Sequence, residues 1–175
     1  MDVFAHTVWA ALSARAINKK KKQRILNVAW TAFWGVFPDL FAFTIPFAGI
    51  IISVLSGDKS FSDFPRGEGS PLFSLAHELY NYSHSLVIWF VVFLVVWKLA
   101  KKPRWELLGW ALHILIDIPT HTEAFFPTPF LFPVSTYHVP FGISWGTPWF
   151  MMLNYSVMLL CFAFLFIRDR KNGKP

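Results

Sequence analysis

Charged residues and cysteine are both scarce in this chain. Only 15% of its 175 residues are charged, whereas globular proteins carry roughly 25%. The single cysteine, Cys161, lies inside an apolar run. One thiol excludes both an internal disulfide and a metal site built from several thiolates. A metal site in this chain would therefore have to be made of histidine and carboxylate side chains.

Apolar segments take the place of the missing charge. The chain is 55% hydrophobic and 19% aromatic, and its mean hydropathy is +0.45. Such values, together with several long apolar runs, are typical of membrane proteins rather than cytosolic ones. We therefore expect residues 1–175 to form a single integral membrane domain.

The net charge of +6 comes from three basic clusters, which hold 13 of the 16 lysines and arginines. These clusters cover residues 19–24, 98–104 and 168–174. Each lies beside an apolar run, which is typical of a cytoplasmic end under the positive-inside rule. Placing all three inside predicts about five crossings, with the N-terminus outside and the C-terminus in the cytoplasm. No basic stretch is interleaved with a nucleic-acid-reading motif, so we expect no direct nucleic-acid binding.

The apolar runs and their breaks predict an all-α bundle. Pro38 and Pro46 interrupt the second run, which favours a helix over 25–43 and then a bent or re-entrant piece to residue 55. The polar stretch 56–70 is expected to be a loop that ends in a helix N-cap at Ser70. Repeated prolines between 121 and 148 predict an irregular, aromatic outer loop. The other expected helices cover residues 3–17, 71–99 with or without an interruption, 105–119 and 149–167.

Several polar residues lie at the same distance from the basic clusters. His6 lies 13 residues before Lys19, and Asp117 lies 13 residues after Arg104. Asp39 and His84 lie 15 and 14 residues from their nearest clusters. At 1.5 Å per residue, each separation corresponds to roughly 20 Å of helix. Four separate segments can therefore bring a polar side chain to one level in the outer half of the bilayer.

His113, Asp117 and His121 are spaced four residues apart, so they share one helix face. An isolated charge in lipid costs about 2.5–3.5 kcal/mol, which predicts that the aspartates face inward and need partners. The pattern predicts a metal site, and its candidate ligands are His6, Asp39, His84, His113 and Asp117. Histidine and carboxylate suit zinc, and also manganese or iron. Two alternatives remain open, namely a proton relay through the aspartates and purely structural polar contacts.

Two other histidines are weaker candidates. His77 shares a helical face with Asn81 and His84, which keeps it in consideration as a ligand. His138 lies in the proline-rich stretch. For each of these histidines taken singly, a role outside a metal site is the simpler interpretation.

In their order along the chain, these residues resemble the motifs of a known family, the membrane-bound metal-dependent hydrolases. This family is also described as LexA-binding, inner-membrane-associated hydrolases. The matching motifs are His6, Pro38-Asp39, Ser83-His84-Ser85 and His113-x-x-x-Asp117 followed by Thr120-His121. Two positions depart from the family pattern, because Ser83 replaces a threonine and Leu79 stands where the family often has a second histidine. The resemblance implies a prokaryotic inner-membrane location and a divalent metal.

The leading functional hypothesis is therefore hydrolysis of an ester or phosphoester in a lipid or lipid-linked substrate. A bound metal would activate water, with His121 and Asp117 as the candidate catalytic residues for proton transfer. The site would face the outer leaflet, and the aromatic loop 125–149 would cover it or anchor at the headgroups. The alternatives are a proton- or ion-coupled transporter that uses Asp39 and Asp117 as relays, and a non-enzymatic membrane scaffold.

Overall fold

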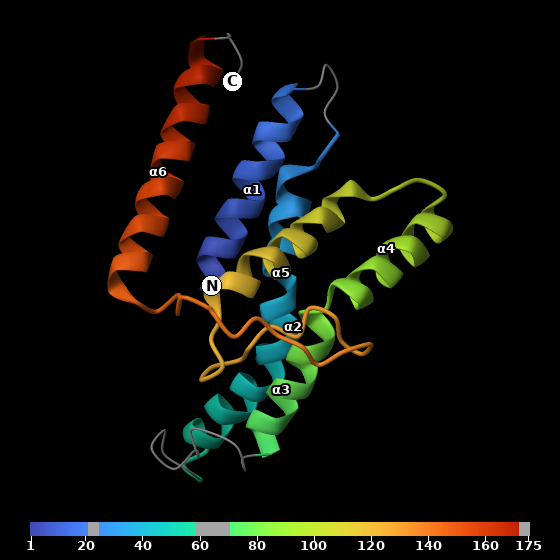
Figure 1. The fold of residues 1–175 in the computed structure, drawn as a ribbon, viewed down its shortest axis with the longest axis vertical. Helices are drawn as coiled ribbons and strands as arrows, with labels where there is room; N and C mark the ends of the chain where they lie inside the picture. Colours follow the sequence, from blue (N-terminus) through green and yellow to red (C-terminus); the bar gives the residue numbers. More distant parts are fainter. Residues whose placement is uncertain (21–24, 59–70, 172–175) are drawn as a thin grey trace.

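The chain is built from helices that surround one long central helix (Figure 1). The computed structural model describes residues 1–20, 25–58 and 71–171, and within these ranges it contains no β-strand. The predicted all-α class is thus confirmed for the described part of the chain. The elements are α1 (Val3–Lys20), α2 (Val28–Leu55), α3 (Pro71–Ser83), α4 (Leu86–Ala100), the 3-10 helix η2 (Trp105–Leu107), α5 (Leu108–Thr120) and α6 (Pro148–Lys171).

Helix α2 is the centre of the bundle and contacts α1, α3 and α5. The Asn27 side chain caps its first turn by accepting hydrogen bonds from the Ala29 and Trp30 amides. The expected break near residue 43 is wrong, because the helix runs unbroken through Pro38 and Pro46. A proline removes only one hydrogen bond from a helix. The apolar turns on either side of each proline continue the helix.

Small residues let the helices around α2 approach closely. A Cβ atom added at Gly35 would overlap Ala10 Cβ of α1, and one added at Gly109 would overlap the Thr31 carbonyl oxygen. Glycine at such crossings allows backbone-to-backbone contact, as is common in membrane helix pairs. Figure 1 shows the result, since the N-terminal end of α1 meets the C-terminal end of α5 beside the middle of α2.

Helices α3 and α4 form a bent pair rather than one straight helix. Their axes differ by 59° across the short break at residues 84 and 85. The Ser85 side chain caps α4 by accepting from the amides of Val87 and Ile88, and it also donates to the Phe132 carbonyl. The interruption left open by the sequence is therefore real. It places His84 at the bend. The N-cap predicted at Ser70 lies outside the described residues.

The segment between α5 and α6 has no regular helix, as its prolines predict. Backbone hydrogen bonds nevertheless attach it to the helix ends. The Ile143 amide donates to the Pro119 carbonyl over 2.9 Å, and the Leu86 amide donates to the Phe130 carbonyl over 2.9 Å. A Cβ at Gly142 would overlap the His121 carbonyl. The segment 121–147 is therefore packed directly against the ends of α4 and α5.

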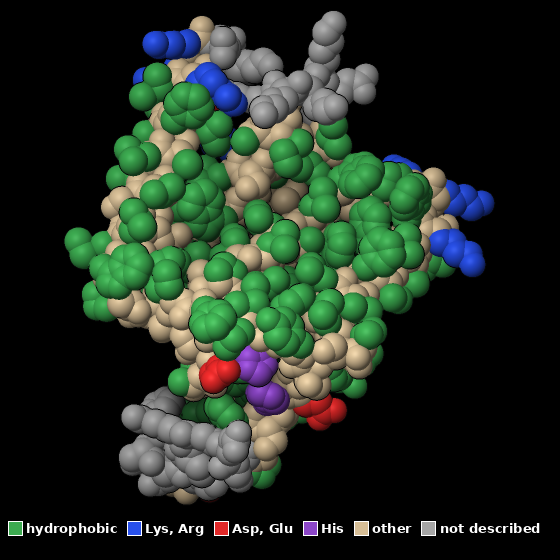
Figure 2. All heavy atoms as spheres, viewed as in Figure 1, with side chains coloured by type: hydrophobic (Ala, Val, Ile, Leu, Met, Phe, Trp, Pro, Cys, Tyr) green, Lys and Arg blue, Asp and Glu red, His purple; other side chains and the backbone are tan. Residues whose placement is uncertain are grey.

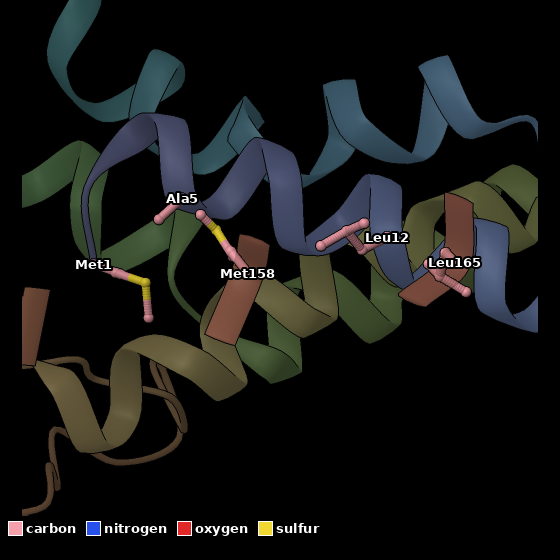
Figure 3. Close-up of a cluster of buried hydrophobic side chains, with 5 residues drawn as sticks. All are labelled: Met1, Ala5, Leu12, Met158 and Leu165. Carbon is pink, nitrogen blue, oxygen red and sulfur yellow. The ribbon is translucent and has the colours of Figure 1, made fainter. Parts of the chain in front are cut away.

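Helix α6 packs on α1 through an apolar seam that Figure 3 shows at close range. The buried side chains of the seam are Met1, Ala5, Leu12, Met158 and Leu165. Polar contacts flank it on both sides. Trp9 donates to Asn154 over 2.8 Å, and Arg15 pairs with Asp169 over 3.1 Å. These contacts fix α1 lengthwise against α6.

Apolar side chains cover most of the surface in Figure 2, and the lysines and arginines gather at its margins. Among the described residues, α2 and α6 are each long and apolar enough to cross a membrane, and the bent pair α3–α4 would make a third span. Length and composition thus support two or three spans rather than the expected five. The shortfall has a simple cause in α5, whose 13 residues cover only about 20 Å of a hydrocarbon core near 30 Å thick.

The contact between α5 and α2 provides a test of the fold. Gly109→Ala should lower the free energy of unfolding of the detergent-purified protein by about 1–3 kcal/mol, and with it the melting temperature. The reason is that the new methyl group would overlap the backbone carbonyl of Thr31, which cannot rotate away. Gly146→Ala is the matched control, since its nearest neighbour is the Ser144 hydroxyl at 3.9 Å. Equal melting temperatures for the two variants would show that α5 does not pack on α2 in this way.

Candidate metal centre

Four polar side chains from distant parts of the sequence meet inside the bundle. Asp39 comes from α2, His84 from the α3–α4 bend, and His113 and Asp117 from successive turns of α5. One potential ligand atom from each lies within 4.8 Å of all the others. The structure therefore brings together four of the five residues that the sequence singled out as metal ligands.

The shortest separations are those expected between atoms that share a cation. His113 Nε2 lies 3.0 Å from His84 Nε2 and 3.0 Å from Asp117 Oδ2. Asp39 Oδ1 lies 3.6 Å from His84 Nε2 and 3.7 Å from His113 Nε2. Ligands placed 2.0–2.1 Å from a zinc ion are separated by about 3.0–3.4 Å in octahedral or tetrahedral geometry. These four separations match this spacing to within a few tenths of an ångström, and all the ligand atoms lie within 4.8 Å of one another.

The outer nitrogen of each imidazole is held by a protein oxygen. His113 Nδ1 lies 2.7 Å from the Gly35 carbonyl, and His84 Nδ1 lies 3.2 Å from the Tyr80 carbonyl. A carbonyl oxygen only accepts, so the Gly35 contact places the hydrogen of a neutral His113 on Nδ1 and the lone pair of its Nε2 toward the cluster. His84 Nδ1 also lies 2.9 Å from the Ser83 hydroxyl, and a hydrogen on this Nδ1 would present its Nε2 lone pair in the same way. Histidines that bind metals show this same arrangement, with the second ring nitrogen donating to a carbonyl or carboxylate.

Burial makes this arrangement costly unless a positive charge balances it. His84 and Asp117 are fully buried, and Asp39 is only 7% exposed. Among the described residues, neither Asp39 Oδ2 nor Asp117 Oδ2 has a hydrogen-bond partner of acceptable geometry. Unpartnered carboxylate oxygens of this kind cost several kcal/mol. Two lone pairs and two carboxylates that face one point are therefore a donor set suited to a divalent cation.

The fifth predicted ligand, His6, lies against the same group from the side of α1. Its Nε2 is 2.9 Å from Asp117 Oδ1, and its ring stacks on that of His113 with centroids 3.6 Å apart. His121 follows α5 directly, and its Nε2 lies 3.4 Å from the same Oδ1. The Met1 nitrogen contacts Asp117 Oδ1 and lies 3.0 Å from His121 Nε2. Of the two predicted catalytic residues, Asp117 therefore belongs to the cluster and His121 borders it.

The two weaker candidates lie apart from the centre. His77 lines a separate surface pocket with Phe73, Ser74, Glu78 and Asn81. His138 is a surface residue whose Nε2 lies 3.7 Å from the exposed Glu123 carboxylate. Neither contributes to the buried group, which agrees with the simpler interpretation of each.

Sequence reasoning did not find the supporting role of Tyr80. Its ring stacks on His84 with centroids 3.6 Å apart, and its hydroxyl lies 3.1 Å from Thr128 Oγ1 and 3.3 Å from His121 Nδ1. Tyr80 therefore connects two histidines of the site to the segment 121–147. The available signal was its position four residues before His84, on the same helix face.

The fold and the site together define a class, namely helical proteins with apolar helices long enough to cross a membrane and a buried His/Asp group suited to a divalent cation. Comparison with protein-family models, curated proteins and solved structures found no match to this chain.

Ligand-induced stabilisation tests the cluster directly. Zinc or manganese at 100 times its Kd should stabilise the chelator-treated protein by about 2.7 kcal/mol, since only the folded bundle assembles the four ligands. The thermal midpoint should then rise by several degrees in the wild type and in His138→Ala, and by little in His84→Ala. An equal rise in His84→Ala would show that the metal binds elsewhere.

Proposed function

We propose that this protein is a membrane-embedded, metal-dependent hydrolase that acts on an ester or phosphoester of a lipid or lipid-linked substrate. The observation that carries the proposal is the buried convergence of the Nε2 atoms of His84 and His113 with the carboxylates of Asp39 and Asp117. The resemblance to membrane-bound metal-dependent hydrolases supports it as well, because all four cluster residues are among those that match the motifs of this family.

The four cluster residues would hold the metal, with zinc favoured by the donor set and manganese or iron also compatible. Such an ion supplies Lewis-acid chemistry, since it polarises the scissile group and lowers the pKa of water. The Gly35 and Tyr80 carbonyls hold His113 and His84 in the orientation that this binding requires. The protein thus contributes a preorganised site that excludes bulk water.

His121 is placed to move a proton at the edge of the cluster. Its Nδ1 lies 2.8 Å from the Phe126 carbonyl, so the neutral ring keeps a lone pair on Nε2. Asp117 Oδ1 lies 3.4 Å from that Nε2 and would stabilise the imidazolium after proton uptake. This pairing of a general base with an orienting carboxylate is a common catalytic arrangement.

The segment 121–147 is suited to control access to the site. It packs on His121 through Phe126 and Gly142, and it exposes aromatic rings such as Tyr137 and Phe141. Aromatic side chains favour the membrane interface. Because the cluster residues are at most 7% exposed, substrate entry requires part of this segment to move aside. A lipid headgroup would then approach from the interface.

The distribution of the aspartates argues for the hydrolase over a transporter. A relay along a transport pathway places ionisable groups in sequence across the membrane. Here Asp39 and Asp117 share the same two imidazole partners, His84 and His113. Shared partners at one depth fit a cation site better than a path.

Metal content and lipid hydrolysis test the proposed function together. Wild type and His138→Ala should carry zinc, manganese or iron and release product from phospholipid in mixed micelles. The double variant His113→Ala, Asp117→Ala should lose both the metal and at least about 10²-fold in rate, because it removes half of the donor set and the orienting carboxylate. Equal metal content in wild type and the double variant would refute the hypothesis, and ion flux in liposomes that survives chelation would favour the transporter.

The membrane orientation belongs to the same proposal. We infer that all three basic clusters face the cytoplasm of a prokaryotic inner membrane, with α1 and α5 completing five crossings and the site toward the outer leaflet. In a background that carries Cys161→Ser, a cysteine at exposed Glu123 should react with an impermeant thiol reagent in intact cells. A cysteine at exposed Lys101 should react only after permeabilisation. The opposite pattern would place the site toward the cytoplasm.

A further inference from the structure

The two oxygens of Asp117 face two different sets of donors. Oδ2 lies 3.0 Å from His113 Nε2 and 3.5 Å from His84 Nε2, within the cluster described above. Oδ1 lies 2.9 Å from His6 Nε2 and 3.4 Å from His121 Nε2. The carboxylate is fully buried, so water does not satisfy either oxygen. One side chain thus connects two groups of imidazoles.

The second group has the features of a donor set in its own right. His6 is 1% exposed, and neither of its ring nitrogens has a hydrogen-bond partner of acceptable geometry among the described residues. His121 Nδ1 is held by the Phe126 carbonyl, which leaves the lone pair of Nε2 facing Asp117 Oδ1. Both Nε2 atoms therefore lie within 3.4 Å of Asp117 Oδ1, and the Met1 nitrogen is the donor that reaches Oδ1 and His121 Nε2.

The stacked pair His6 and His113 sets the distance between the two groups. Their rings are nearly parallel, with an interplanar angle of 23° and centroids 3.6 Å apart. Each Nε2 points at a different oxygen of the same carboxylate. Cations bound by two such rings would be separated by a similar distance. Metal ions in two-metal hydrolytic sites lie about 3.5–4 Å apart.

We propose that His6, His121 and Asp117 Oδ1 form a second divalent-cation site, with the Asp117 carboxylate bridging it to the first. This inference rests on the proposed function and deepens it. It also replaces the proton-moving role given to His121, because the single free lone pair on His121 Nε2 cannot bind a cation and accept a proton at once. A pair of cations stabilises both the attacking and the leaving oxygen of an in-line displacement at phosphorus. Because such a pair suits displacement at phosphorus, the substrate class that we assign is a phosphoester of a lipid or lipid-linked molecule.

The Met1 nitrogen marks the position of this second site. It lies between His121 Nε2, at 3.0 Å, and Asp117 Oδ1, and it donates to these acceptors. A cation at this position has to displace that nitrogen or recruit it as a ligand. The second ion should therefore bind more weakly than the first, and binding should proceed in two resolvable steps.

Manganese titration of the chelator-treated protein, residues 1–175 in detergent, tests the second site independently of activity. We expect two manganese ions per wild-type chain and per His138→Ala chain. His6→Gln and His121→Gln should each bind one ion and keep the tighter step, and Asp39→Ala should lose the tighter step. Electron paramagnetic resonance should show a spin-coupled manganese pair in wild type that is absent from His6→Gln and His121→Gln. Thermal melting verifies that each variant is folded.

The outcomes separate the two proposals. One ion in wild type, with the same single ion retained in folded His6→Gln and His121→Gln, would overturn the second site and leave the proposed function standing. No bound ion in wild type would overturn the proposed function and the second site together. Two uncoupled ions would show that Asp117 does not bridge them.

Discussion

The buried carboxylate of Asp117 is the constraint on which the arrangement of the bundle depends. It has no access to solvent, and it is surrounded by imidazoles from α1, from the α3–α4 bend and from α5 itself. A charge in such a place is stable only with compensating partners at hydrogen-bonding or ligand distance. The helices that supply these partners must therefore end, bend or cross at this point.

Three local features of the chain satisfy that constraint. Gly35 and Gly109 bring α1 and α5 into backbone contact with α2, which places His6 and His113 beside Asp39. The bend capped by Ser85 turns His84 inward where a straight helix would carry it past the site. The segment 121–147 is attached by backbone hydrogen bonds to the C-terminal end of α5 and the N-terminal end of α4, which keeps it beside His121. The contacts that hold the helices together are thus also those that position the histidines and aspartates of the cluster.

A buried His/Asp centre in an apolar bundle limits the substrates it can serve. Soluble metabolites would have to cross apolar side chains, whereas a lipid headgroup reaches the interface with its acyl chains still in the membrane. The ring of Phe125, an exposed aromatic residue of the segment 121–147, lies with its centroid 6.5 Å from that of His121. This geometry relates the proposed lipid substrate to the position of the site as well as to its ligands.

Much of the site was predictable from the sequence, because the few polar residues of apolar helices must face the interior of the bundle and contact one another there. That reasoning selected His6, Asp39, His84, His113, Asp117 and His121. It was wrong in placing the last three on one helix face, because α5 ends at Thr120 and His121 follows it in an extended conformation. It also predicted the irregular segment after α5, and it left open the interruption that the structure shows between α3 and α4. It was wrong about a break in α2, since a proline weakens a helix locally but the surrounding apolar turns decide whether the helix continues.

The sequence by itself supplied the candidate residues of the site, and it predicted that they lie at a similar distance along their helices because helical rise is a fixed quantity per residue. Only the tertiary structure decided which atoms meet. Convergence depends on how closely the helices approach and how they rotate about their axes, and contacts between residues far apart in the chain set both. The division of Asp117 between two imidazole groups, the Nδ1 anchors on carbonyl oxygens and the role of Tyr80 are all consequences of that packing.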